Sequence, residues 1–288
     1  MPSSKPTPAS KPKKAQRLDK TIDAIQGRYT ERALQRGREM HVAHPPALVS
    51  SFPQLDALTG CDGIPLNHTT LLSGRDITSG RLTLAYKILA GAQTPQSGES
   101  RATPSRAAQS RAAQSRRKQL VVVMDLCRMA NADYMARCGI DLEHAVITRP
   151  ESAHDAINLL VDIVRSKRVR AVLVNTLPDL AGEARSLDAG LAVLKQILPR
   201  SNCAVIFVDD PQPLWQRWLP VFDRSAIRQT AALHLELRNE QWLDYGDDAH
   251  LRGYRSRVEV IRSHWARSGQ HTNIEILFNG TVKAGPVW

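Results

Sequence analysis

Between Gln119 and Asp210, short unbroken apolar runs alternate with longer segments in which apolar residues recur at helical spacing. An unbroken run such as QLVVVMDL is typical of a strand that is buried on both faces of a parallel sheet. The runs predict strands at 119–126, 144–149, 170–177 and 202–210, and the periodic segments predict helices at 131–139, 152–166 and 186–198. Strands that alternate with helices predict an α/β fold with three layers and a mostly parallel central sheet.

The helix predicted at 152–166 carries the clearest local signals. Ser152 stands at the N-cap position, where its hydroxyl can accept a hydrogen bond from the first helical turn. The apolar stripe predicted to face the core consists of Ala156, Leu159, Leu160 and Ile163.

The C-terminal part of the chain changes to an alternation with a period of two, at 231–238, 255–264 and 273–285. This alternation is typical of strands with one buried and one exposed face. We therefore expect these segments to extend the sheet as antiparallel strands.

The N-terminal region contains a tail and a predicted helix. The tail at 1–16 is rich in Pro, Ser and Lys and is predicted to be disordered. A helix is predicted from Arg17 to Arg36, with an apolar face that includes Leu18, Ile22 and Ile25. Because an isolated amphipathic helix is marginally stable, we expect the segment 17–44 to dock on a surface, as an oligomerisation element or on its own core.

The core predicted at 45–288 is interrupted by a low-complexity segment at 94–119. The pentapeptide SRAAQ occurs there twice in tandem, at 105–109 and 110–114. Because the segment offers little apolar surface to pack, we expect a basic surface insertion between a helix and the next strand.

The formal net charge of +11 is concentrated in two segments. Residues 1–20 carry six Lys or Arg against Asp19, and residues 94–118 carry six against Glu99, so each segment contributes +5 and the rest of the chain is nearly neutral. Basic segments of this kind favour a salt-sensitive contact with single-stranded DNA, and they are equally compatible with solubility tails.

Other compositional features exclude some classes of protein. No apolar run approaches the roughly 18 residues that a membrane span needs, so we expect no membrane contact and a cytoplasmic location. The four cysteines, Cys61, Cys127, Cys138 and Cys203, show no metal-ligand spacing and are predicted to be small buried groups.

The stretch LLSGRDITSGRLTLAYKILAGAQ, residues 71–93, has the layout of a phosphate-binding loop: a strand end, a loop with two glycines, then a helix. Its details depart from that motif. Five residues separate Gly74 from Gly80 where four are usual, and Arg81-Leu82 stands where Lys-Ser/Thr is expected. On these residues alone, an ordinary turn between a strand and a helix is equally compatible.

The surrounding segments resemble the opening of bacterial RecA recombinases, in the same order. LDKTIDAIQGRYTERALQRG resembles their polymerisation helix, LDALTGCDGIP their approach strand, and GRLTLAYKILAGAQ their phosphate-loop helix. The resemblance continues through RAVLVNTLPDL and NCAVIFVDD to the closing strands, from about Leu18 to Gly285. It implies a RecA-like core.

The resemblance also implies where nucleotide-binding residues would lie, and most of those positions are altered. Arg81 replaces the phosphate lysine, Leu82 the magnesium-binding hydroxyl, Cys127 the water-activating glutamate, and Asn175 the Walker B aspartate, while Asp210 replaces the sensing glutamine. The degenerate site would comprise Gly74, Ser79, Gly80, Arg81, Leu82, Thr83, Asp125, Tyr134 (the adenine-stacking tyrosine) and Asn175.

These changes remove functions that phosphoryl transfer requires. Leucine cannot ligate Mg²⁺, an asparagine oxygen is a weak ligand for a hard cation, and a thiol is a poor base for water. We therefore predict that hydrolysis is absent and that no residue is catalytic. Binding of ATP without Mg²⁺-dependent chemistry stays open, because arginine still pairs well with phosphate.

Two further groups have alternative interpretations. The segment 211–229 combines aromatic and basic residues, which suits stacking on single-stranded DNA or a helix docked on the core; its candidate DNA contacts are Trp215, Arg217, Trp218, Arg224 and Arg228. Asp125, Asp209 and Asp210 end strands, where they would form a cation site or, more simply, loop carboxylates. By the resemblance, Arg262 and His264 would reach a neighbouring subunit's ATP.

The sequence is thus interpreted as a non-catalytic RecA-like accessory protein in DNA repair, recombination or damage-induced mutagenesis. ImuA-type accessory proteins share this pattern, which adds a DNA polymerase to the expected partners, beside single-stranded DNA, an active RecA recombinase and further copies of the chain. The alternatives are a divergent ATP-dependent recombinase and a protein scaffold without DNA contact.

Overall fold

The computed structural model describes residues 44–50, 52–74, 77–94, 118–175, 184–209, 225–245, 248–278 and 282–284, together with Thr21 and Ala24, which are helical. The chain divides into two units, Met1–Ala43 and His44–Trp288. The features below belong to the second unit. Several predictions on the sequence lie outside the described residues: Leu18, Ile22, Ile25, the insertion at 95–117, and residues 210–224.

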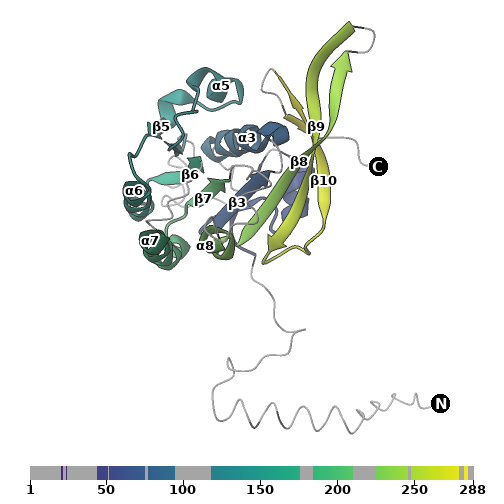
Figure 1. Cartoon of the computed structure of the whole chain (residues 1–288). Coiled ribbons are helices and arrows are strands. Elements are labelled where there is room, and N and C mark those ends of the chain that lie inside the picture. The colour runs from purple at the N-terminus through teal and green to yellow at the C-terminus, as the bar shows by residue number, and fades with distance from the viewer. Residues whose placement is uncertain are drawn as a thin grey trace, which may run out of the picture. The chain divides into compact units, whose positions relative to one another are not determined.

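The second unit is built on a twisted sheet whose described strands run in the order β11-β10-β9-β8-β3-β7-β6-β4-β5 (Figure 1). The strands are β3 (Thr69–Gly74), β4 (Leu120–Asp125), β5 (Ala145–Thr148), β6 (Val169–Asn175), β7 (Ala204–Val208), β8 (Leu233–Tyr245), β9 (Asp248–Ser263), β10 (His271–Leu277) and β11 (Val282–Ala284). A separate antiparallel pair joins β1 (Ala47–Leu48) to β2 (Ile64–Pro65).

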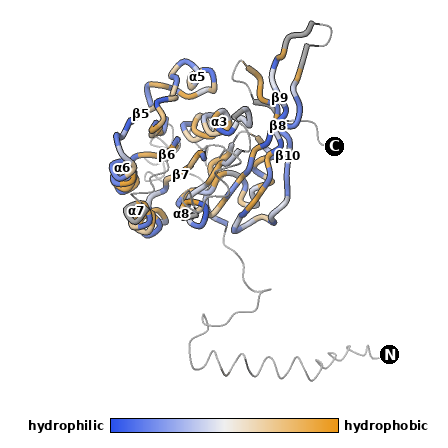
Figure 2. The backbone as a smooth tube through the Cα atoms, viewed as in Figure 1, coloured by the Kyte–Doolittle hydropathy of each residue, from blue (hydrophilic) through white to orange (hydrophobic). Residues whose placement is uncertain are grey.

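Helices cover both faces of the parallel part of this sheet. On one face lie α3 (Arg81–Gln93) and α5 (Ala132–Arg137), and on the other α6 (Ala153–Ser166), α7 (Ala184–Ile197) and α8 (Ser225–Thr230). Helix α2 (Pro53–Thr59) packs on the antiparallel strands β9 and β10. A hydrophobic core lies on each face of the sheet, and consecutive residues of β3 contribute to the two cores in turn. Leu72 packs on the α3 side and Leu71 on the α6 side. Figure 2 shows the hydrophobic positions concentrated along these strands and the helix faces turned toward them. The predicted three-layer α/β fold is confirmed.

The parallel strands match their predicted positions closely. From β8 through β3, β7, β6 and β4 to β5, every neighbouring pair is parallel. Strands β4, β6 and β7 are almost entirely buried, as their unbroken apolar runs indicate. The register places the last residues of β4 and β6, Asp125 and Asn175, side by side.

The closing strands differ from the prediction in length and direction. The segment predicted as an antiparallel strand at 231–238 is the start of β8, which pairs parallel with β3 and antiparallel with β9. Strand β8 continues to Tyr245 and β9 begins at Asp248, and these outer parts pair with each other. The segment 273–285 contains two strands, β10 and β11, rather than one.

Two local predictions need correction. The predicted approach strand begins as a helix, α2, with Pro53 in its first turn, and becomes strand only at Ile64–Pro65. On α6, Ser152 caps the helix by accepting from the Asp155 N–H, as predicted. Its buried face, however, is centred one residue away from the predicted stripe: Ala156, Ile157, Leu160, Val161 and Val164 are buried, and Leu159 and Ile163 only partly.

Three of the four cysteines, Cys61, Cys138 and Cys203, are buried as predicted. The prediction was wrong for Cys127, which lies in the turn after β4 and is partly exposed. Among the described helices, none is long and apolar enough to cross a membrane.

Candidate functional site

The loop after β3 is the one whose sequence has the layout of a phosphate-binding loop. It passes through a short 3-10 turn, Ile77–Ser79, and enters α3 at Gly80. Gly80 has a φ of +81°, a conformation that side chains disfavour, and it caps α3 without a side-chain hydrogen bond. The two glycines identified in the sequence therefore stand at the end of β3 and at the start of α3.

Two side chains at the end of the loop, Ser79 and Arg81, pack against Gly74. A Cβ atom at Gly74 would lie 2.2 Å from the Ser79 Oγ and 3.2 Å from the Arg81 Nη1. The Arg81 Nη1 donates to the Ser79 Oγ at 3.2 Å, and Arg81 is only 8% exposed. The Arg81 guanidinium therefore lies against Ser79 and Gly74.

The outside of the turn is covered by the closing strands. A Cβ atom at Gly80 would lie 1.9 Å from the Ile276 Cδ1 and 2.9 Å from the Tyr254 hydroxyl. The Ser256 hydroxyl donates to the Ser79 carbonyl at 2.8 Å, and the Asn239 side chain donates to the Thr78 hydroxyl at 3.4 Å. The loop is therefore tied to β8, β9 and β10 by side-chain packing and hydrogen bonds.

Two other residues of the predicted site, Thr83 and Tyr134, interact with each other within the chain. Thr83 and Tyr134 share a hydrogen bond of 2.6 Å between their hydroxyls, and the Tyr134 ring packs edge-on against Tyr86. Burial raises the pKa of Tyr134. Leu82, at the position of the metal-binding hydroxyl, packs partly buried against the core, so this position supplies no oxygen to a cation.

The carboxylates at the strand ends have structural partners. Asp125 is fully buried and accepts from the backbone N–H groups of Met129 and Ala130 at 2.9 and 3.0 Å, and from the Arg149 Nε at 3.3 Å. Asp209 pairs with Arg228 at 3.3 Å. Asp125 therefore caps the turn after β4, and both carboxylates are buried rather than solvated on loops. The contacts of Asp125 leave it few free lone pairs for a cation. Asp210 lies outside the described residues.

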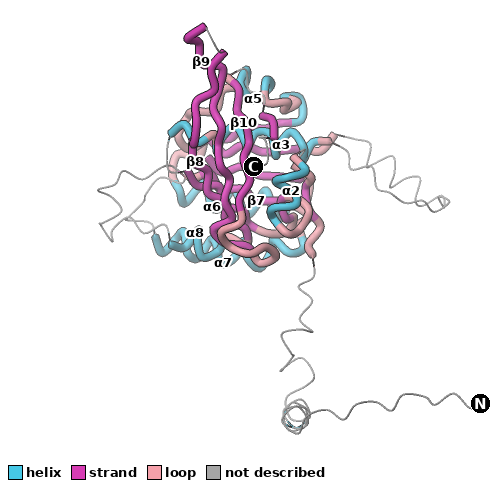
Figure 3. The backbone as a smooth tube through the Cα atoms, turned by 90° about the vertical axis from the view of Figure 1, so that its right-hand side faces the viewer, coloured by secondary structure: helices cyan, strands magenta, loops and turns pink. Residues whose placement is uncertain are grey.

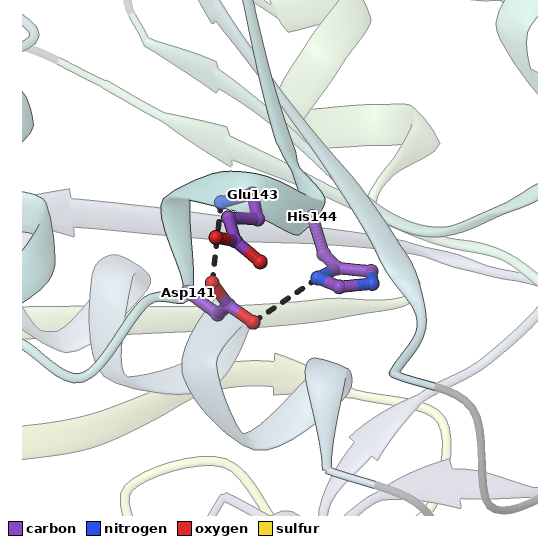
Figure 4. Close-up of side chains that lie close together, drawn as sticks. All are labelled: Asp141, Glu143 and His144. Carbon is purple, nitrogen blue, oxygen red and sulfur yellow. Dashed lines mark hydrogen bonds and ion pairs between the residues drawn. The ribbon is translucent and has the colours of Figure 1, made fainter.

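A second group of side chains has the composition of a cation site, and the sequence analysis did not identify it. Asp141, Glu143 and His144 lie close together before β5 (Figure 4). Asp141 accepts from the Glu143 N–H and the His144 Nδ1, at 3.1 and 3.0 Å, and pairs with Lys118 at 2.6 Å. The Lys118 hydrogen bond lowers the pKa of Asp141. Asp141 therefore caps a turn and has its own counter-ion.

The two residues expected to reach a neighbouring subunit make contacts within the chain. The Arg262 Nη1 donates to the carbonyls of Arg228 and Gln229 at the end of α8, at 3.4 and 3.2 Å. His264 lies beside Trp265, with ring centroids 5.5 Å apart. Both side chains are exposed, so their role toward a neighbour stays a prediction. Of the candidate DNA-binding residues, only Arg228 is among the described residues.

The sequence reasoning missed a buried polar pair beside the loop. The Ser73 Oγ and the His234 Nε2 share a hydrogen bond of 2.7 Å between β3 and β8. Burial, followed by the charge of Arg228, lowers the pKa of His234 to about 4. The histidine is therefore a neutral hydrogen-bonding group at neutral pH. Its position within an alternating strand gave no signal that its side chain would be buried.

Comparisons with known proteins agree with the resemblance. No protein-family model matches the chain. The chain is 22% identical over 293 residues to protein RecA of Chlorobium limicola, covering 95% of this chain and 77% of the relative. It is 21% identical over 287 residues to protein RecA of Aquifex pyrophilus, covering 92% and 74%. The crystal structure of the RadB recombinase matches with a TM-score of 0.59 at 14% identity, covering 83% of this chain and all of that one. The chain is RecA-like in sequence and has the recombinase fold.

Proposed function

We propose that this RecA-like chain is an accessory protein of DNA repair, recombination or damage-induced mutagenesis that does not hydrolyse ATP. It acts by binding DNA, an active RecA recombinase or a DNA polymerase, in the bacterial cytoplasm and at the nucleoid. The observation that carries the proposal is the close packing of side chains on the two loop glycines: Ser79 and Arg81 lie against Gly74, and Ile276 and Tyr254 lie against Gly80.

The chemistry of the site supports the absence of hydrolysis. Transfer of a phosphoryl group needs a bound metal, an oriented water and positive charge on the phosphates. Leu82 and Asn175 do not supply a hard anionic oxygen for Mg²⁺, and Cys127 does not supply a base. Arg81 is the remaining cation, and it is turned into the loop. An intact fold with this site is more consistent with a binding protein than with an enzyme.

The contact with DNA is assigned mainly to the basic segments at 1–16 and 94–118, and the segment 211–229 is the next candidate if these are not required. The described carboxylates at the strand ends form ion pairs within the chain, Asp125 with Arg149 and Asp209 with Arg228. Most of the excess positive charge therefore comes from the two basic segments. Contacts of this kind release counter-ions and weaken steeply as salt rises.

Two assays test the proposal. ATP turnover is measured with and without single-stranded DNA, for the wild type and for Arg81→Ala, and both proteins are expected at background. Turnover within about tenfold of an active recombinase, abolished by Arg81→Ala, would instead establish the alternative, an ATP-dependent recombinase.

The second assay measures binding to a single-stranded oligonucleotide over a salt series, for the full chain and for the chain lacking 1–16 and 94–118. The proposal predicts a steep salt slope that flattens in the deletion. An unchanged affinity and slope would move the contact to the folded core, and no binding by either protein would favour a scaffold that contacts proteins only.

A further inference from the structure

Three aromatic side chains form a row across β8, β9 and the end of β10. Trp242 on β8 lies directly opposite Tyr254 on β9, and Phe278 follows the last residue of β10. The ring centroids of Trp242 and Tyr254 are 5.7 Å apart, and those of Tyr254 and Phe278 are 6.4 Å apart. Figure 3 shows the three strands lying side by side. We call these three residues the aromatic row.

The two ends of the row are exposed, while its centre is fixed in the core. Trp242 is 46% exposed and Phe278 is 54% exposed. Tyr254 is buried in the core cluster on the α3 side of the sheet, and its hydroxyl would lie 2.9 Å from a Cβ atom at Gly80. Each exposed ring is therefore backed by a rigid buried ring. Such a ring loses little conformational freedom when it contacts a flat partner.

The chemistry of the row suits the bases of a single-stranded nucleic acid. Clustered exposed apolar side chains mark a binding surface. Aromatic rings on neighbouring strands of a sheet stack on unpaired bases, and this stacking tolerates any sequence because every base has a flat π face. A duplex keeps its bases stacked inside the helix. The row is therefore suited to a single strand rather than to a double helix.

Two features of the surroundings favour a nucleic acid as the occupant. The Phe278 N–H donates to the Arg252 carbonyl, which places a basic residue directly opposite Phe278. The second feature is the position of the row in the sheet. Because β3, β7 and β8 run parallel, their carboxyl ends share one edge, and the segment 211–229, a candidate for DNA contact, begins shortly after β7. Trp242 lies on the part of β8 that continues beyond this same edge.

We propose that the aromatic row is a stacking site for the bases of single-stranded DNA. The proposal rests on the function proposed above, and it adds a contact with bases to the phosphate contacts of the basic segments. Trp242 and Phe278 each stack on one base, and Tyr254 holds the two rings in position. Because stacking on a base releases no condensed counter-ions, this contribution persists at salt concentrations that weaken the phosphate contacts.

The test measures binding of the full-length chain to labelled oligothymidylate and to an abasic strand of the same length, by fluorescence anisotropy over a salt series. The wild type should bind oligothymidylate more tightly than the abasic strand. Trp242→Ala and Phe278→Ala should each weaken binding to oligothymidylate about tenfold and leave binding to the abasic strand unchanged. Trp242→Phe keeps a ring at this position and should retain most of the wild-type affinity.

Two matched controls separate stacking from general apolar contact. Leu251 and Ile261 are exposed apolar residues of β9, at 52% and 38%, and neither has a ring. Leu251→Ala and Ile261→Ala should therefore bind both strands as the wild type does. A loss in Leu251→Ala as large as that in Trp242→Ala would overturn stacking as the mode of contact. Circular dichroism verifies that every variant is folded.

The remaining outcomes separate this proposal from the function on which it rests. Folded ring variants that bind oligothymidylate as tightly as the wild type would overturn the stacking site and leave the salt-sensitive contact of the basic segments in place. If those variants lost only the binding of an active RecA recombinase, the row would be a protein-docking surface, and the stacking site would again be overturned. A wild type that binds neither strand would contradict both proposals.

Discussion

The two halves of the sheet contribute differently to the loop that they share. The parallel half, from β3 to β5, is held together by buried aliphatic side chains. It has the geometry expected of a nucleotide-binding core, because the loop connects the end of β3 to the start of α3. The closing half supplies the side chains that occupy the space around the loop: Tyr254 and Ser256 from β9, and Ile276 from β10. The comparison indicates that one half of a sheet can maintain the fold while side chains from the other half determine the surroundings of the loop.

The largest effect is expected where the two halves meet, at Gly80. In Gly80→Ala, the alanine must adopt a left-handed backbone conformation, and its methyl group would lie 1.9 Å from the Ile276 Cδ1. The free energy of unfolding, measured in urea, should fall by about 3 kcal/mol. Gly269→Ala is the matched control: it has a similar φ of +86° and nothing within 4 Å of its Cβ, so the loss should be about 1 kcal/mol. Equal losses in both variants would show that Ile276 does not press on the loop.

The next effect concerns pH, through His234 at the junction of β3 and β8. Its pKa is lowered to about 4 in the fold, from 6.5, so the unfolded chain binds an extra proton between these values. Its contribution to stability is therefore complete above pH 6.5 and is lost progressively as the pH falls toward 4, by up to about 3 kcal/mol.

Comparison with His234→Gln isolates this effect from other titrating groups, since the glutamine can still bond to Ser73 but does not titrate. As the pH is lowered from 7 to 4.5, the unfolding free energy of the wild type should fall more than that of His234→Gln. Parallel stability curves would mean that His234 is solvated in the fold.

The smallest effect is expected for Ser256→Ala, which removes hydrogen bonds to the Ser79 and Arg238 carbonyls. The loss of unfolding free energy should be about 1–2 kcal/mol. Ser166→Ala, at an exposed helix end, is the control and should cost less than about 0.5 kcal/mol. Hydrogen exchange should also become faster at residues 77–80 in Ser256→Ala; unchanged exchange there would contradict the tie between β9 and the loop.

The same contrast explains how far the sequence could predict the structure. Buried parallel strands such as β4 and β7 are continuous apolar runs, and their positions and direction followed from that pattern alone. The outer parts of β8 and β9, around Glu240 and Arg255, contain polar residues and a register shift, so their length carried no periodic signal.

The packing around the candidate site could not be predicted from the sequence. That Arg81, Leu82 and Asn175 replace nucleotide-binding residues follows only from the resemblance and stays a prediction. That Ser256 bonds to Ser79, 177 residues away in the chain, and that Ile276 packs on Gly80 depend on the closing of the sheet, which no local pattern encodes.

The central claim is that the loop, whose glycines are closely packed by Ser79, Arg81, Ile276 and Tyr254, does not take up nucleotide productively. Isothermal titration calorimetry with ATPγS and Mg²⁺ tests it most directly, on the wild type and on Arg81→Ala. The account predicts no saturable heat for either protein at nucleotide concentrations up to about 1 mM. Saturable Mg²⁺-dependent binding by the wild type in the micromolar range, lost in Arg81→Ala, would contradict it.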